Sequence, residues 1–183
     1  MRLIPAIVLL ASTTLFIGSA EAKKKREKKF DCGWEGEELD PFTGIDSRTT
    51  GRSWGNGVTI RFGRPNEGVS TGKVALTIRE ATDEPFSGPI QFLLMDKTVV
   101  TADLEPPVPG AVGVNSSGYA YTYFEMPLVL TAADLEMIST GLGVTRVRFN
   151  LPVGSPWDMV FNEGDEGQLP SYAQCALAPT PVE

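Results

Sequence analysis

The sequence predicts an all-β fold with one short helix, and two features of the chain carry this prediction. Apolar and polar residues alternate in residues 58–62, 73–79 and 146–153. Such alternation places one face of a strand in a core and the other in water, which is typical of antiparallel sheets. The chain also holds 19 glycines and 14 prolines, many of them between these segments. Short strands separated by such turns indicate a β-sandwich or a barrel.

The first half of the chain predicts an irregular segment followed by strands. Residues 30–56 are rich in Gly, Asp and Glu and predict loops with one short strand at residues 30–34. After the strands at 58–62 and 73–79, a dense apolar run predicts a buried strand at residues 90–95. Asp96 and Lys97 then turn the chain into a strand at residues 98–104. Prolines and glycines predict a loop at residues 105–118.

The second half predicts strands around the single helix. Residues 119–130 indicate one strand or a pair, with Pro127 at an edge or a break. Thr131 and Asp134 have the spacing of a capping box, and Gly141 suits the end of a short helix. Strands are expected at 146–153 and 157–162. We therefore predict one immunoglobulin-like antiparallel β-sandwich of about seven or eight strands over residues 30–183.

The N-terminus has the pattern of a secretory signal peptide. A positive start is followed by an apolar run from Leu3 to Ile17 and by Ala20-Glu21-Ala22, which predicts cleavage after Ala22. Six basic residues and one acid then form a basic arm from Lys23 to Lys29. Because positive charge resists translocation, the alternative is an uncleaved membrane anchor. The main expectation is an exported protein, periplasmic or secreted, with no transmembrane span after cleavage.

The two cysteines, Cys32 and Cys175, lie near the two ends of the expected domain. In an oxidising compartment such a pair forms a disulfide. Two buried free thiols are the alternative if the chain is anchored facing the cytoplasm. Two thiols without histidine do not fill a zinc shell, so no metal site is predicted.

The charge distribution restricts the class of partner. The net charge is −7, but residues 30–183 hold nine basic and twenty-one acidic residues, which gives −12. This acidic body argues against nucleic-acid binding, which needs a cationic surface. The basic arm suits weak contact with an anionic membrane surface, or it is a solvated leader.

The chain contains no histidine. This removes Ser-His-Asp and Cys-His nucleophiles and His-bearing metal sites. No phosphate- or dinucleotide-binding motif is present, and no cofactor is predicted. Carboxylate chemistry remains, because acids cluster at residues 35–46 and 158–166. Residues 162–167 (NEGDEG) also offer oxygen ligands for calcium without the spacing of a known loop. Acidic surface loops are the more common explanation of both clusters.

Two candidate binding sites remain. Tyr119, Tyr121 and Tyr123 share one face of a strand, and Trp54 in a Gly-rich loop is the candidate fourth aromatic. Exposed, they would bind a sugar or a partner protein. The alternative is that they support neighbouring strands or face the core.

The second candidate is a basic face for an anion. It comprises outward positions on the alternating strands: Arg61, Arg79, Arg146 and Arg148. Lys73 occupies a similar position. Cross-strand pairing with acids is the alternative.

The sequence thus favours an exported, non-catalytic β-sandwich that binds a protein, a glycan or a cell-envelope component. A small carboxylate hydrolase and a structural envelope protein are the alternatives.

Overall fold

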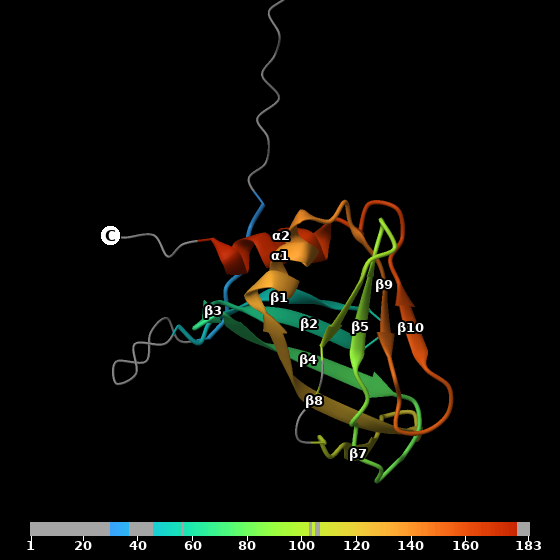
Figure 1. Cartoon of the computed structure of the whole chain (residues 1–183). Coiled ribbons are helices and arrows are strands. Elements are labelled where there is room, and N and C mark those ends of the chain that lie inside the picture. The colour runs from blue at the N-terminus through green and yellow to red at the C-terminus, as the bar shows by residue number, and fades with distance from the viewer. Residues whose placement is uncertain (1–29, 37–45, 56, 103, 105–106, 179–183) are drawn as a thin grey trace, which may run out of the picture.

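The computed structural model describes residues 30–36, 46–55, 57–102, 104 and 107–178. The predicted signal peptide, the basic arm and most of the first acidic cluster, residues 37–45, lie outside these ranges. Within them the chain forms ten strands and two helices. The strands make two antiparallel sheets that face each other, and both helices lie at one end (Figure 1).

The larger sheet holds six strands in the order β1-β2-β4-β8-β7, with β3 paired to the start of β4. Its strands are β1 (Thr49–Trp54), β2 (Val58–Gly63), β3 (Pro65–Asn66), β4 (Val69–Ile78), β7 (Ala111–Val114) and β8 (Ala120–Thr131). β8 is continuous through Pro127, which pairs with Lys73 of β4. β7 pairs only with the first four residues of β8. Pro127 therefore lies on a free edge, where its missing N–H costs no ladder hydrogen bond.

The smaller sheet holds four strands in the order β10-β9-β5-β6. They are β5 (Ile90–Leu94), β6 (Val99–Ala102), β9 (Val144–Phe149) and β10 (Trp157–Val160). The predicted β5–β6 hairpin is present, with Lys97 at φ 73° in its turn. The Asp96 carboxylate stabilises this turn by accepting a hydrogen bond from the N–H of Thr98 at 2.9 Å.

The core lies between the two sheets. Inward side chains of alternating strands are fully buried, as predicted for residues 58, 60, 62, 74, 76, 147 and 149. The rings of Phe62 in β2 and Phe92 in β5 lie 6.4 Å apart and join the sheets. Phe86 and Phe124 make a second ring contact at 5.6 Å. Close packing of such side chains is what fixes the relative position of the sheets.

Two helices close one end of the sandwich: α1 (Ala132–Thr140) and α2 (Gln168–Leu177). The predicted capping box of α1 is present, since Thr131 Oγ1 accepts from the N–H of Asp134 at 3.1 Å. The Asp134 carboxylate in turn accepts from the N–H of Thr131 at 3.2 Å. The two helices pack on each other, and Gln174 donates a side-chain hydrogen bond to the Ser139 carbonyl at 2.9 Å.

The predicted disulfide joins Cys32 to Cys175 of α2, with the two Cα atoms 5.8 Å apart. A second contact holds the same N-terminal segment. The guanidinium of Arg64 lies 4.7 Å from the ring centroid of Trp34, and Asp46 bridges Arg64 and Arg48 at 3.0 and 2.8 Å. The segment before β1 is therefore attached covalently and by charge to the helical end of the domain.

The structure corrects five parts of the expected element map. The strand expected at residues 146–153 ends at Phe149. Residues 30–34 form no strand, and the nearest pairing is a single bridge between Glu35 and Thr49. β1 forms in the segment expected to be loop, because β2 supplies its ladder partner. β7 lies inside the expected loop at 105–118, and α2 is a second helix where only one was expected. An immunoglobulin-like arrangement is not confirmed; the coarser prediction, two antiparallel sheets in a mostly β domain, is.

Candidate functional site

The orientation of β8 decides where the tyrosines lie. Thr122, Phe124 and Met126 are buried, so the alternate residues Tyr121 and Tyr123 face away from the core. Tyr119 precedes the strand and is 71 % exposed. All three tyrosines therefore belong to the outer surface of the larger sheet.

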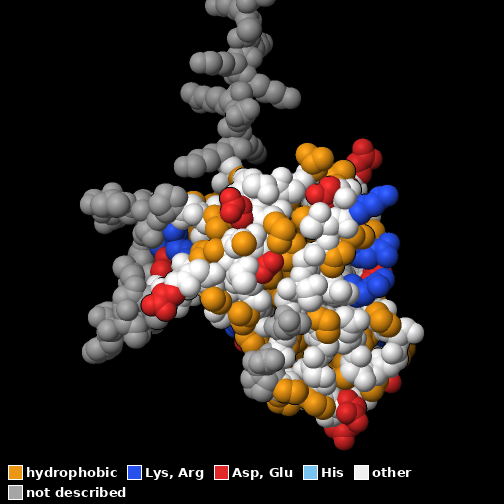
Figure 2. Space-filling view, viewed as in Figure 1, with side chains coloured by type: hydrophobic (Ala, Val, Ile, Leu, Met, Phe, Trp, Pro, Cys, Tyr) orange, Lys and Arg blue, Asp and Glu red, His pale blue; other side chains and the backbone are white. Residues whose placement is uncertain are grey.

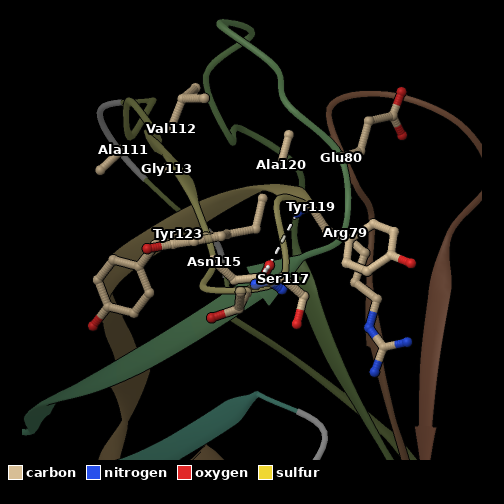
Figure 3. A pocket seen from close by; sticks show the side chains of 12 residues that line it. Arg79, Glu80, Ala111, Val112, Gly113, Asn115, Ser117, Tyr119, Ala120 and Tyr123 are labelled. Atoms are coloured by element: carbon tan, nitrogen blue, oxygen red, sulfur yellow. Dashed lines mark hydrogen bonds between the residues drawn. The ribbon is translucent and has the colours of Figure 1, made fainter.

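These tyrosines line a hollow of about 1300 Å³, which we call the tyrosine groove. One wall is formed by residues 111–113 of β7, and the other by Arg79 and Glu80 just after β4 (Figure 3). Thr77 of β4 contributes from the centre of the sheet. Residues from three separate segments thus converge on one surface depression.

Small residues on β7 let the tyrosine rings of β8 lie close to its backbone. Gly113 pairs directly with Tyr121, and Ala111 pairs with Tyr123. A Cβ atom added at Gly113 would lie 2.6 Å from both Cζ and Oη of Tyr121. The Tyr121 ring therefore lies against the backbone of β7, and an aromatic side chain across an edge glycine stabilises such a strand. Tyr121 has a supporting role as well as an exposed surface.

A compact turn positions the exposed tyrosine. The Asn115 side-chain oxygen accepts hydrogen bonds from the N–H groups of Ser117 and Tyr119, both at 3.0 Å (Figure 3). The N–H of Gly118 donates to the Asn115 carbonyl at 2.9 Å, and Gly118 has a φ of +82° that favours glycine. The backbone of Tyr119 is thereby held in place, while its ring stays in solvent.

The hydroxyl of Tyr123 belongs to a small charged network at the side of the groove. It donates to one Glu125 carboxylate oxygen at 2.9 Å, and Lys73 Nζ lies 2.6 Å from the other. Lys73 and then Tyr123 hold the pKa of Glu125 below its usual value. Burial, and then the carboxylate, raise the pKa of Tyr123, so its phenol stays neutral at physiological pH.

The groove combines apolar ring faces with few polar groups. In the described part of the chain, the hydroxyls of Tyr119 and Tyr121 have no hydrogen-bond partner, and no ion pair holds Arg79. Glu80 supplies a carboxylate on the same wall. Aromatic surfaces with a small number of oriented polar groups are typical of ligand-binding pockets.

Trp54 does not join the tyrosines. It pairs with Val58 on the inward side of β1, and its ring contacts Phe161 edge-on at 5.6 Å. The Arg52 guanidinium lies 5.5 Å from the same ring. Trp54 therefore supports the core edge between the sheets, on the opposite face of the larger sheet from the groove.

The four arginines of the expected anion-binding face are not brought together. Arg61 lies on the outer side of β2 and pairs with Glu35 at 2.7 Å, whereas Arg79 lines the groove. Arg146 and Arg148 lie on the outer side of the smaller sheet, where Figure 2 shows basic side chains along one edge. Both pair with Asp158, at 2.9 and 2.7 Å. Cross-strand pairing with acids thus accounts for three of the four.

One carboxylate of each acidic cluster, Asp46 and Asp158, forms ion pairs with arginines. The pKa of Asp46 is lowered chiefly by Arg48, and the pKa of Asp158 chiefly by Arg148. A general acid needs the opposite shift.

The acidic loop at residues 162–167 uses its carboxylates internally. Glu166 accepts from the N–H of Gly164 at 2.7 Å, and Asp165 accepts from the Gln168 side chain. Within the described ranges, no three acidic or thiol side chains gather as a metal site. The same ranges contain no helix both long and apolar enough to cross a membrane.

Sequence reasoning missed the β7 wall of the groove. The segment reads AVGV-NSSG-YAYTYF, in which apolar residues flank a four-residue turn that contains Gly118. A short polar loop with glycine between two strand-forming runs is a hairpin signal. The prolines just before this segment favoured a loop more strongly than the turn favoured a hairpin, so a loop was predicted.

Comparison with known proteins finds no matching family model, curated protein or solved structure.

Proposed function

We propose that this protein is an exported, non-catalytic binding module that engages a protein, a glycan or a cell-envelope component through the tyrosine groove. The observation that supports this most directly is the groove itself. It places three tyrosines and Arg79, which has no ion-pair partner among the described residues, around a hollow of about 1300 Å³. Ligand sites are concave, largely apolar and equipped with a few polar groups, and this surface has all three properties.

Export is supported by two independent features. The first 22 residues have the order of a signal peptide, and Cys32 and Cys175 form a disulfide, which persists in oxidising compartments. Intact mass of the protein recovered outside the cytoplasm should show the loss of residues 1–22 and of two hydrogens. A full-length, reduced product would support the membrane-anchor alternative instead.

Binding through the groove is tested with a glycan array, an envelope extract and a peptide array. Tyr119→Ala should weaken binding of any captured ligand by about tenfold, which corresponds to about 1.4 kcal/mol, because an exposed aromatic is lost. Tyr119 suits the test because its side chain makes no hydrogen bond within the described structure.

Tyr172→Ala is the matched control for this experiment. Tyr172 lies in α2, where its ring contacts Phe30 edge-on at 4.8 Å, outside the groove. It should leave ligand affinity unchanged. Equal affinity of the Tyr119 variant and the wild type would contradict the proposal. So would a loss of the same size in the Tyr172 variant.

A further inference from the structure

Among the described residues, β7 is an edge strand that lacks the usual protection of an edge. It lies at the end of the larger sheet, and no described strand pairs with its outer side. Its four residues, AVGV, include no charged residue and no proline. Native sheets normally protect their edges with lysine, proline, bulges or covering segments, because an open edge is a template for another strand.

The backbone of Val112 and Val114 points to this open side. The N–H of Asn115 donates to the Tyr119 carbonyl at 2.9 Å, so these two residues form a hydrogen-bonded pair. In an antiparallel ladder such pairs alternate, which makes Gly113 with Tyr121 the next one. The intervening residues, Val112 and Val114, direct their N–H and C=O groups away from β8.

Both faces of β7 offer apolar contacts to an added strand. On one face lies the tyrosine groove, where the Tyr121 ring covers Gly113 and Tyr123 pairs with Ala111. On the other face Val112 is 56 % and Val114 67 % exposed. β7 lies at the end of the molecule opposite the helices, and hydrophobic side chains are visible there in the space-filling view (Figures 1 and 2).

We propose that β7 accepts an extended segment of a different protein as an added strand, with alternate side chains of that segment entering the tyrosine groove. This inference rests on the proposed function and names its partner class. In strand addition, backbone hydrogen bonds provide affinity, and pockets for alternate side chains provide selectivity. The groove is such a pocket, placed beside the free edge.

The chemistry of the site defines the partner segment. Side chains that face the groove would stack on the tyrosine rings above Ala111 and Gly113, which favours aromatic or long side chains. Those on the other side would meet Val112 and Val114, which favours β-branched apolar residues. The domain from residue 30 onward carries −12, so basic flanking residues complement it.

A second copy of this chain is the less suitable occupant. Two domains of charge −12 repel each other. The edge itself is only four residues long, and a stable specific interface buries on the order of 1,200–2,000 Å². A short basic segment needs far less area for weak, regulated binding.

Amide hydrogen exchange of the wild-type protein tests the inference directly. The probe is the peptide KVTVYVK, acetylated and amidated, which has apolar alternation and basic ends. Binding should slow exchange at Val112 and Val114 by at least about tenfold, while the amides of Val99 and Val160, on edges of the smaller sheet, keep their rates. Unchanged exchange at Val112 and Val114 with millimolar peptide would overturn the inference.

Variants of the edge give the second readout. Val112→Pro removes the free N–H but no hydrogen bond to β8, and it should weaken peptide binding at least about tenfold. Val160→Pro makes the same change at a free N–H of β10, on an edge of the smaller sheet, and should bind as the wild type does. Val114→Lys should also weaken binding, whereas Val160→Lys, the same change at an exposed position of β10, should not.

The outcomes separate this inference from the proposed function. A glycan that binds in a Tyr119-dependent way without protecting Val112 would support the groove and overturn the added strand. Sedimentation that shows a dimer with protected Val112 amides would overturn the heterologous partner. Peptide protection of Val114 that Val112→Pro abolishes and Val160→Pro preserves would support both proposals.

Discussion

Removal of the Cys32–Cys175 disulfide should cost a large part of the stability of this domain. The bridge links residues 143 positions apart. In the chain-entropy model a loop of this length corresponds to about 5 kcal/mol at 25 °C, which is an upper value when the native bridge is strained. Single domains unfold with a free energy of about 5–15 kcal/mol. The Cys32→Ala/Cys175→Ala variant should therefore keep its fold only marginally.

Urea unfolding, followed by tryptophan fluorescence, measures this effect. With a slope of about 2 kcal/mol per molar urea, the loss of about 5 kcal/mol should lower the midpoint by about 2.5 M. Reduced wild-type protein is the matched control, because it loses the bridge but keeps both sulfur atoms, and its midpoint should fall equally. Since the groove lies at the end opposite the helices, exchange at β7 in the folded variant should stay as in the wild type. A midpoint within about 0.3 M of the oxidised protein would refute the loop-entropy reasoning.

Three further substitutions test particular contacts. Gly113→Ala should destabilise the domain by about 1–3 kcal/mol in urea unfolding, because its Cβ would lie 2.6 Å from the Tyr121 ring; an unchanged midpoint would mean that the ring moves aside freely. Asp158→Asn should lower the midpoint at pH 7. Arginine neighbours depress the folded pKa of Asp158, so its contribution is present above about pH 4 and disappears as the pH falls through that lowered pKa. A difference between this variant and the wild type that stays constant down to pH 2 would contradict the assignment. Thr131→Ala should cost about 1 kcal/mol and speed amide exchange in α1, since it removes the cap of Asp134 N–H; equal exchange rates would argue against the capping box.

Only part of the candidate site could be predicted from the sequence. It identified Tyr119, Tyr121 and Tyr123 as one face of a strand, because side chains alternate along any strand. It could not determine which face is core. That choice depends on β4 and on the opposite sheet, which cover Phe124 and leave the tyrosines outside.

The charged residues illustrate the same limit. The outward positions of Arg61, Arg146 and Arg148 follow from alternation within each strand, yet their partners are remote in sequence. Glu35 is 26 residues from Arg61, and Asp158 is 12 from Arg146. Strand order places them together, and strand order is set by packing between elements rather than by any local pattern.

The sequence by itself determined the features that depend on residues close together in the chain. These were the alternating core positions of β2, β4 and β9, the β5–β6 hairpin, and the capping box that starts α1 at Thr131. The pairing of Cys32 with Cys175 also followed from the sequence, since there are only two cysteines.

Tertiary structure alone decided the elements whose own residues favour them weakly. β7 is a strand because β8 offers it a ladder and Tyr121 covers Gly113. α2 forms despite Pro170 because this proline lies in the first turn, where a backbone N–H would have no partner within the helix. Packing on α1 and the disulfide hold α2 in place. In β7 and α2, hydrogen bonds and buried contacts with distant segments outweigh the weak strand or helix propensity of the residues themselves. The contacts of β7 with β8 also build the groove.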